Sequence, residues 1–354
     1  MLPELEGLRA VAALGIVVTH VSFQTGLESA LFERFDFFVS VFFALSAFLL
    51  ARGPHRKGYY RRRFARIAPA YLACVVVVML ALPALAGIWL RQVLANLFLV
   101  QIYVPDGLVA GLTQLWSLCI EVAFYLVLPL YLALGPRRRS VALVVSVVLG
   151  LLWPWATDGL DVPINLQTTP LSYAPWFAVG LACAEVERYR LVKASAMPRF
   201  RWVGPLLGLA VAWVAGQEWV GPRGLVHPSP AEFNARIILG TFFAALVLVP
   251  YALWPREQGL LAGPVMRALG KWSYGIFLWH VAVLDIAFPV LGVDLFTGSP
   301  VDFGLVLVFT VAVSVAVAYI SYELVEKRFL PRRGPATQAS ATHPARVTAT
   351  ESPA

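Results

Sequence analysis

The sequence predicts an all-α membrane protein that crosses the lipid bilayer about ten times, with both termini in the cytoplasm. Two observations lead to this fold class. Of the 354 residues, 59% are hydrophobic and only 14% are charged, and the mean hydropathy is +0.74. A soluble domain carries about 25% charged residues. The charged residues that remain cluster between long apolar runs, which is typical of a chain with several membrane-spanning helices.

Apolar runs recur along the whole chain and were judged against the length of a spanning helix, about 17–25 residues. We place them at residues 5–23, 36–51, 67–88, 113–134, 141–157, 172–186, 203–219, 235–254, 272–291 and 303–325. A further run, residues 92–103, is too short to span and is expected to be an interfacial or re-entrant segment.

The basic residues set the orientation of these spans. With a cytoplasmic N-terminus, 24 of the 28 Lys and Arg residues fall on the cytoplasmic side, and the outer side keeps Arg34, Arg91, Arg223 and Arg236. This asymmetry follows the positive-inside rule. We therefore predict a multi-pass membrane protein with cytoplasmic N- and C-termini.

One domain accounts for the apolar part of the chain, residues 1–330. Residues 331–354 are rich in Pro, Ala, Ser and Thr and are expected to form a disordered cytoplasmic tail. The three cysteines, Cys74, Cys119 and Cys183, lie inside apolar runs without the spacing of metal ligands. We therefore expect no disulfide, no metal site and no bound cofactor.

Arg9 and His20 stand eleven residues apart in the first apolar run. Eleven steps of about 100° place both side chains on one face of a helix, about 16 Å apart along its axis. Ionisable side chains inside a membrane are candidate functional residues because they are costly to keep there. The alternative is structural: Arg9 extends to the interface and His20 hydrogen-bonds to a neighbouring helix.

The densest group of basic residues lies in the loop expected at residues 52–66. Arg62, Arg63 and Arg66 could form a phosphate-binding platform, because several guanidinium groups converge within a few residues. The alternative is an orientation signal that also binds lipid headgroups. On the outer side, the loops around residues 157–172 and 218–232 combine amides, acids and an indole. That composition suits a sugar-like acceptor, although any solvated loop has a similar one.

Further motifs accompany the Arg9–His20 spacing. They are FFALSAFL at residues 42–49, RRFARIAPAY at 62–71, LWSLCIEVAFY at 115–125, GKWSYGIFLWH at 270–280 and YELVEKR at 322–328. Together they resemble the acyltransferase-3 family of integral-membrane O-acyltransferases, in the family's order and over nearly all of residues 5–330. The chain departs from the pattern at Phe38 and Ala47, where the family often has glycine. Within that family, the chain most resembles the actinobacterial branch.

The resemblance implies an enzyme that transfers an acyl group, usually acetyl, from cytoplasmic acyl-CoA as co-substrate. The implied acceptor is a hydroxyl group of a carbohydrate or glycolipid of the cell envelope, or alternatively of a macrolide or other secondary-metabolite glycoside. The expected partners are acyl-CoA, the acceptor and the lipid bilayer, and no nucleic acid. The resemblance also implies that the membrane is a bacterial plasma (inner) membrane.

The singled-out residues fit this chemistry. CoA phosphates could be neutralised by Arg9, Arg62, Arg63 and Arg66. His20 lies deeper and is expected to be the general base, because an imidazole can take a proton from a hydroxyl group near neutral pH. Glu121 is expected to orient a catalytic histidine or hold the acceptor, or else to make a structural hydrogen bond.

Supporting roles are expected for Ser46, Trp116, Tyr125, Tyr274 and His280. Ser46 could carry an acyl group, but a helical serine usually bonds to its own backbone, and no base is visible beside it in the sequence. We therefore expect direct transfer without an acyl-enzyme. Asp285 lies about 140° around the helix from His280 and is expected to make a different contact.

Two other functions are compatible with ionisable residues inside the membrane. A proton-coupled transporter also needs intramembrane His, Glu and Arg, but it should show two similar halves, and we find no internal repeat. A membrane scaffold that only binds lipid would tolerate replacement of Arg9 and His20.

Overall fold

The structure is a computed structural model that describes residues 2–53, 57–191, 200–222 and 226–329, and in that part of the chain it is all-helical. Each predicted apolar run corresponds to one helix. These are α1 (Pro3–Thr25), α2 (Phe38–Ala51, preceded by η1, Glu33–Phe37), α3 (Tyr59–Ala81), α5 (Trp116–Ala133, preceded by η4, Thr113–Leu115), α6 (Pro136–Ala156), α7 (Ala174–Arg188), α8 (Val203–Ala215), α9 (Pro230–Ala252), α10 (Pro264–Leu291) and α11 (Pro300–Ser321).

Within the described residues, 8 helical segments are long and apolar enough to cross a membrane. This confirms a polytopic membrane protein. The helices α7 and α8 are shorter, with 15 and 13 residues. The number of about ten crossings and the cytoplasmic position of the termini stay predictions.

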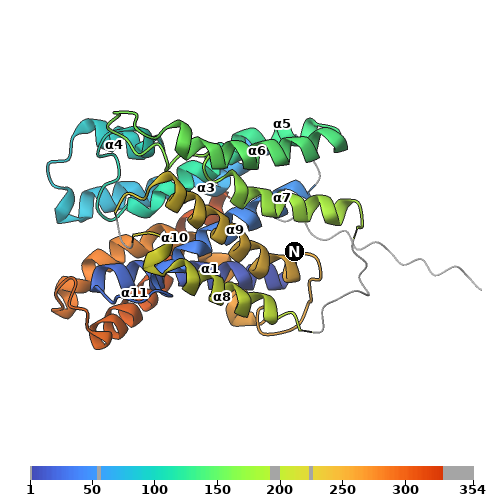
Figure 1. Cartoon of the computed structure of the whole chain (residues 1–354). Helices are drawn as coiled ribbons and strands as arrows, with labels where there is room; N and C mark the ends of the chain where they lie inside the picture. The colour runs from blue at the N-terminus through green and yellow to red at the C-terminus, as the bar shows by residue number, and fades with distance from the viewer. Residues whose placement is uncertain (1, 54–56, 192–199, 223–225, 330–354) are drawn as a thin grey trace, which may run out of the picture.

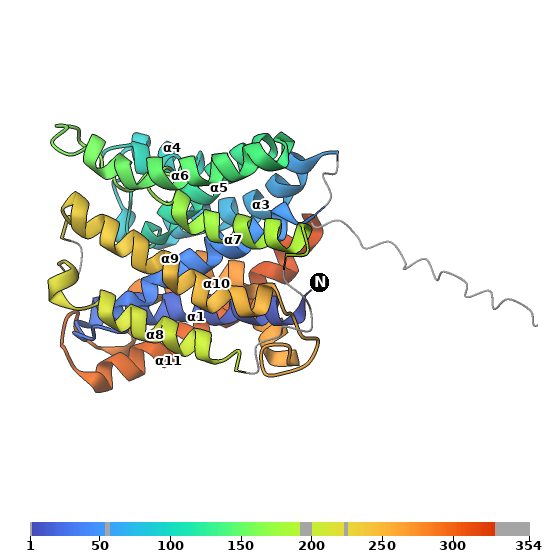
Figure 2. The same ribbon diagram turned by 45° about the vertical axis from the view of Figure 1, so that its right-hand side comes forward.

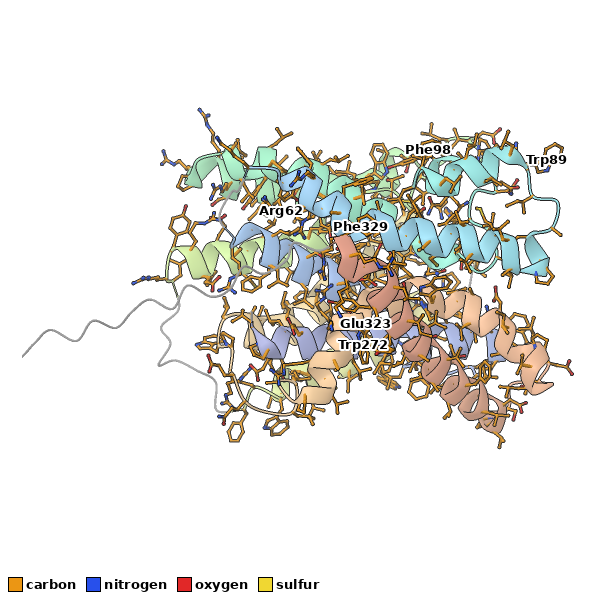
Figure 3. The ribbon with its side chains drawn as sticks, turned by 180° about the vertical axis from the view of Figure 1, so that it is seen from behind. Arg62, Trp89, Phe98, Trp272, Glu323 and Phe329 are labelled. Atoms are coloured by element: carbon orange, nitrogen blue, oxygen red, sulfur yellow. The ribbon has the colours of Figure 1, made fainter. Side chains whose placement is uncertain are left out.

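The apolar run at residues 92–103 does not form a spanning helix, as expected. It contributes to α4 (Leu90–Leu97) and to η3 (Gln101–Tyr103). The flanking side chains of Trp89 and Phe98 are 71% and 73% exposed and point outward at one end of the bundle (Figure 3). Exposed aromatic residues beside a short helix are typical of a segment at the membrane interface.

The expected start of the third helix, residue 67, was wrong. The helix α3 begins at Tyr59, directly after Gly58, whose φ of 77° is left-handed. Arg and Lys are good helix formers and can extend their charged ends beyond the apolar region, so the basic residues continue the helix instead of forming a loop. Arg62, Arg63 and Arg66 therefore lie on the first two turns of α3.

The chain after α11 continues through a π-helical turn, η7 (Tyr322–Glu326), into α12 (Lys327–Phe329). Figure 3 shows this end, labelled at Phe329, close to the start of α3 at Arg62, and the segments are in contact. The predicted tail, residues 331–354, and the domain boundary at residue 330 lie outside the described residues.

The axes of the long helices are roughly aligned. The helices α4 and α6 lie along one edge of the bundle, and α8 and α11 lie along the opposite edge (Figures 1 and 2). The helix α1 lies in the interior and packs against α2, α10 and α11. A Cβ atom at Gly270 of α10 would lie 2.0 Å from the carbonyl oxygen of Glu6. Only glycine permits this approach, which brings α10 alongside α1 in the same direction.

Candidate active site

A cavity of about 100 Å³ lies between α1, α2, α3, α5 and α10. It has room for several water molecules or for part of a ligand. Its apolar wall includes Ile16, Phe42 and Phe277. Its polar wall consists of Arg9, Ser46, Arg63, Arg66, Ser117, Glu121, Tyr125 and Tyr274. Most of the site residues expected from the sequence therefore line one interior space.

Helical spacing brings the polar groups of α3 and α5 to this space. Arg63 and Arg66 are three residues apart on α3, and Glu121 and Tyr125 are four apart on α5, so each pair shares a helix face. The early start of α3 is decisive, because residues in a loop would not have this fixed spacing.

Glu121 accepts hydrogen bonds from two hydroxyl groups on one carboxylate oxygen. The donors to its Oε1 are the Ser46 hydroxyl from α2 and the Tyr125 hydroxyl from α5, and these two hydroxyl oxygens are themselves 3.4 Å apart. Charge-assisted hydrogen bonds offset part of the cost of a carboxylate in an apolar helix. Neither His20 nor His280 is among the hydrogen-bond partners that the structure gives to Glu121.

Among the described residues, the arginines that line the cavity differ from several other arginines in having no salt bridge to a carboxylate. Arg52, Arg139, Arg188 and Arg201 each form a salt bridge with a glutamate. In the described part of the chain, no carboxylate lies within 4.0 Å of the guanidinium group of Arg9, Arg63 or Arg66. Arg9 interacts with Glu121 and with Glu326 of η7 only at longer range, and Arg66 repels it.

Three guanidinium groups that converge without a close carboxylate can bind an anion. Arginine is well suited to phosphate because its planar fork donates two parallel hydrogen bonds. The cavity therefore has the charge and the donor groups to hold a phosphorylated ligand, and the mixed hydroxyl and apolar wall can accommodate the rest of it.

A pair of histidines joins α1 to α10. His20 Nδ1 and His280 Nε2 are 2.8 Å apart. The ring planes differ by only 6° and the ring centroids are 4.9 Å apart. These values fit two rings lying edge to edge in nearly one plane, so that the N–H of one ring nitrogen can point at the lone pair of the other.

The surroundings fix where the protons of this pair reside. His280 Nδ1 lies 2.8 Å from the carbonyl oxygen of Phe277, which can only accept, so this nitrogen carries a proton. In the neutral ring His280 Nε2 is then an acceptor, and His20 Nδ1 must donate to it. His20 Nε2 then carries a lone pair that no described residue uses, so the geometry makes this nitrogen the basic atom of the pair.

The histidine pair lies just beyond the cavity. Ile16 and Phe277 line the cavity, and His20 follows Ile16 by four residues, which is about 6 Å along α1. His20 retains some accessible surface, whereas His280 is 0% exposed. A ligand anchored at the arginines and extending along α1 would reach His20.

Other expected site residues lie elsewhere. Arg62 is not among the cavity-lining residues, and its Nη1 donates to the carbonyl of Lys57. Trp116 packs on the ring of Tyr173 at 5.1 Å and does not line the cavity. Tyr274 does line the cavity and donates to the carbonyl of Ile67 at 2.9 Å.

The two loops that the sequence predicted on the outer side, as candidates to hold an acceptor, meet at a second cavity of about 360 Å³. Its polar lining includes Asp158, Asn165, Gln167 and His227. Glu232, by contrast, caps the first turn of α9 together with Ser229. All three cysteines are buried and free, and the described residues contain no cluster of three metal-ligating side chains.

The fold and the site together define a polytopic membrane protein with an interior site that can bind an anion and accept a proton. The family model described as "Acyltransferase domain" matches residues 2–319. The chain belongs to this acyltransferase family, as its motifs indicated, and it is a membrane acyltransferase.

Curated proteins similar to the chain carry matching names. It is 30% identical to Acyltransferase MdmB of Streptomyces mycarofaciens, over 96% of this chain and 95% of that protein. It is 26% identical to Peptidoglycan O-acetyltransferase OatA of Listeria monocytogenes, over 82% of this chain and 50% of that protein. It is 25% identical to Nodulation protein 10 of Rhizobium leguminosarum, over 70% of this chain and 71% of that protein.

The chain thus spans nearly all of the Streptomyces relative but about half the length of the peptidoglycan O-acetyltransferases that it matches. The Streptomyces match agrees with the expected actinobacterial branch. No solved structure matches the chain.

Proposed function

We propose that the protein transfers an acyl group, most simply acetyl, from acyl-CoA to a hydroxyl group of a carbohydrate or glycolipid of the cell envelope. The observation that carries this proposal is the position of the His20–His280 pair. It lies one helical turn beyond a cavity lined by three arginines that lack a close carboxylate.

The arginines supply the donor site. Arg9, Arg63 and Arg66 would bind the phosphate groups of CoA, and the pantetheine chain would extend along α1 toward His20. Eleven residues of helix correspond to about 16 Å, which an extended pantetheine chain can bridge. We infer that this mouth faces the cytoplasm, because the basic residues in the first two turns of α3 lie on the side that the positive-inside rule makes cytoplasmic.

The histidine pair supplies the base. His20 Nε2 takes the proton of the acceptor hydroxyl while its oxygen attacks the thioester carbonyl carbon. The carbon–sulfur bond then breaks, and the CoA thiolate leaves with the proton that His20 returns. His280 accepts the hydrogen bond from His20 Nδ1 and so keeps the lone pair of Nε2 directed at the substrate.

A two-step route would use Ser46, since Glu121 lies beside its hydroxyl group. In that route the acyl group rests on Ser46 before the acceptor arrives. Labelled acyl-CoA without acceptor decides between the routes. Direct transfer predicts no covalent acyl-protein, and a labelled Ser46 peptide would establish the two-step route.

The donor half of the proposal is tested by release of the CoA thiol, followed with a thiol reagent on the purified protein. The three native cysteines are buried, which keeps the background low. His20→Ala should lower kcat by about 10²–10⁴, the usual effect of removing a general base, with little change in the KM for acyl-CoA. Thiol release unchanged in this variant would contradict the role of His20, and a transporter would release no thiol at all.

Charge removal tests the arginines separately. Arg63→Gln with Arg66→Gln should raise the KM for acyl-CoA, and more so at high salt. The matched control is Arg137→Gln with Arg138→Gln, because both of these arginines are exposed at the start of α6. If both double variants raised the KM equally, the cavity arginines would act only through the general positive charge of the protein and not as a binding site.

A second acceptor class is a macrolide or other secondary-metabolite glycoside. It is favoured by the Streptomyces acyltransferase that aligns over 95% of its length. Feeding labelled acyl-CoA to membranes with either envelope glycans or a soluble glycoside, and identifying the labelled product, separates the two classes.

A further inference from the structure

The interface between α1 and α10 continues beyond the histidine pair with a second polar contact. Gln24 Nε2 donates to Asp285 Oδ1 at 3.1 Å. Gln24 follows His20 by four residues, which is about 6 Å further along α1 and away from Arg9. The His20–His280 and Gln24–Asp285 contacts are therefore successive links between two parallel helices, and the second lies on the side opposite the arginine cavity.

This contact leaves hydrogen-bonding capacity unused. Gln24 Oε1 is buried, and in the described part of the chain it has no hydrogen-bond partner. Asp285 accepts from the Gln24 amide, and the backbone N–H of Gly111 lies near its carboxylate, which keeps further lone pairs. A carboxylate and an unsatisfied amide oxygen inside a membrane protein are both costly unless a ligand uses them.

A ligand can approach these groups from the histidine pair. His20, Gln24 and Asp285 are only partly buried as residues, whereas His280 is 0% exposed. The interface thus presents one basic nitrogen at His20 and, about 6 Å further along α1, the carboxylate of Asp285, with the buried and unsatisfied Gln24 Oε1 beside it.

We propose that Gln24 and Asp285 bind the non-reacting hydroxyl groups of a polyhydroxylated acceptor, a carbohydrate, and hold its reacting hydroxyl at His20 Nε2. This inference rests on the proposed function. Neighbouring sugar hydroxyl groups donate to carboxylate and amide oxygens, and one monosaccharide ring is long enough to reach from His20 to Asp285. A few placed polar groups of this kind fix the orientation of a ligand in an otherwise apolar site.

Asp285 could instead serve only to anchor the backbone at Gly111 and the end of α1. A structural role predicts that its loss affects every acceptor alike. A binding role predicts that only acceptors with several hydroxyl groups are affected. The comparison therefore needs two alcohols that share a reacting primary hydroxyl group and differ in the others.

The kinetic test compares methyl β-D-glucoside with cyclohexylmethanol as acceptors for the purified protein. Asp285→Asn should lower kcat/KM for methyl glucoside about 10- to 100-fold, as expected for weakening a hydrogen bond to a charged group. It should leave kcat/KM for cyclohexylmethanol and the KM for acyl-CoA unchanged. The matched control, Asp294→Asn, changes an exposed carboxylate in the loop after α10 and should behave like the wild type.

A second measurement does not depend on turnover. Saturation-transfer NMR without any acyl donor should show methyl glucoside binding to the wild type and to Asp294→Asn, but not to Asp285→Asn. Equal kinetic losses for both alcohols, unchanged binding in Asp285→Asn, or no binding to the wild type would each overturn the inference. Binding of methyl glucoside without any release of CoA thiol would instead contradict the proposed function and leave the carbohydrate site standing.

Discussion

His280 offers a direct test of how the histidine pair works, because it never needs to touch the substrate. Its side chain is fully buried, its Nδ1 donates to the carbonyl of Phe277, and its Nε2 accepts from His20 at 2.8 Å. His280→Leu keeps a side chain of similar bulk and removes the acceptor. His20 is then left with an unsatisfied Nδ1–H, or it moves that proton to Nε2 and loses the basic lone pair there.

The size of the effect follows from this geometry. Leaving a buried donor without a partner costs about 1–3 kcal/mol. If that cost falls on the catalytically competent tautomer, it corresponds to about a 5- to 150-fold loss in kcat. His280→Gln should lose less, because its side-chain carbonyl oxygen lies near the place of Nε2 and can still accept from His20.

The assay is release of CoA thiol at saturating acceptor, with the melting temperature in detergent as the control for folding. The KM for acyl-CoA should not change in either variant, because the pair lies beyond the arginine cavity. The double variant His20→Ala, His280→Leu should be no slower than His20→Ala alone, since His280 acts only through His20. Wild-type kcat in His280→Leu, or additive losses in the double variant, would refute the reasoning.

Three further predictions test other parts of the structure. Glu121→Gln should lower kcat about 10- to 100-fold without raising the KM for acyl-CoA, because the cavity becomes more positive while Ser46 and Tyr125 lose a charged acceptor; a raised KM would contradict this. Single cysteines introduced for Asn165 and Gly58 should be labelled from outside at 165 only, and the reverse pattern would overturn the topology. Arg201→Met should destabilise the protein by about 3–5 kcal/mol by leaving Glu4 charged and buried, and replacing both partners should restore much of that loss.

The sequence located the helices better than their ends. Apolar runs identify which residues must avoid water, so each predicted run corresponds to a helix. The ends depend on how far charged residues continue the helix, and α3 shows the limit, since its first eight residues were expected in a loop. The correction matters for function because it gives Arg63 and Arg66 a fixed spacing at the cavity.

The composition of the site was more predictable than its contacts. Arg9, Glu121 and Tyr125 were expected and line the cavity, but the partners of Glu121 and His20 were not identified. Ser46 lies 75 residues from Glu121, and His280 lies 260 residues from His20. A membrane helix is apolar on almost all sides, so its pattern does not reveal which face meets which neighbour. Gln24 could not be predicted as a site residue, because the sequence does not show that an amide near the end of a helix contacts Asp285.

The separation of 260 residues between the paired histidines has a consequence for biogenesis. Membrane helices enter the bilayer in the order of synthesis. His280 of α10 can therefore fix the tautomer of His20 only after nearly the whole membrane domain has been made. Until then the nascent chain carries the arginines of α1 and α3, but His20 lacks its partner and the cavity lacks the wall that α10 supplies with Tyr274 and Phe277. Such a chain should be unable to consume acyl-CoA. Fragments that end before Pro264 should therefore be inert however well they insert, and supplying α10–α12 as a separate chain should restore turnover.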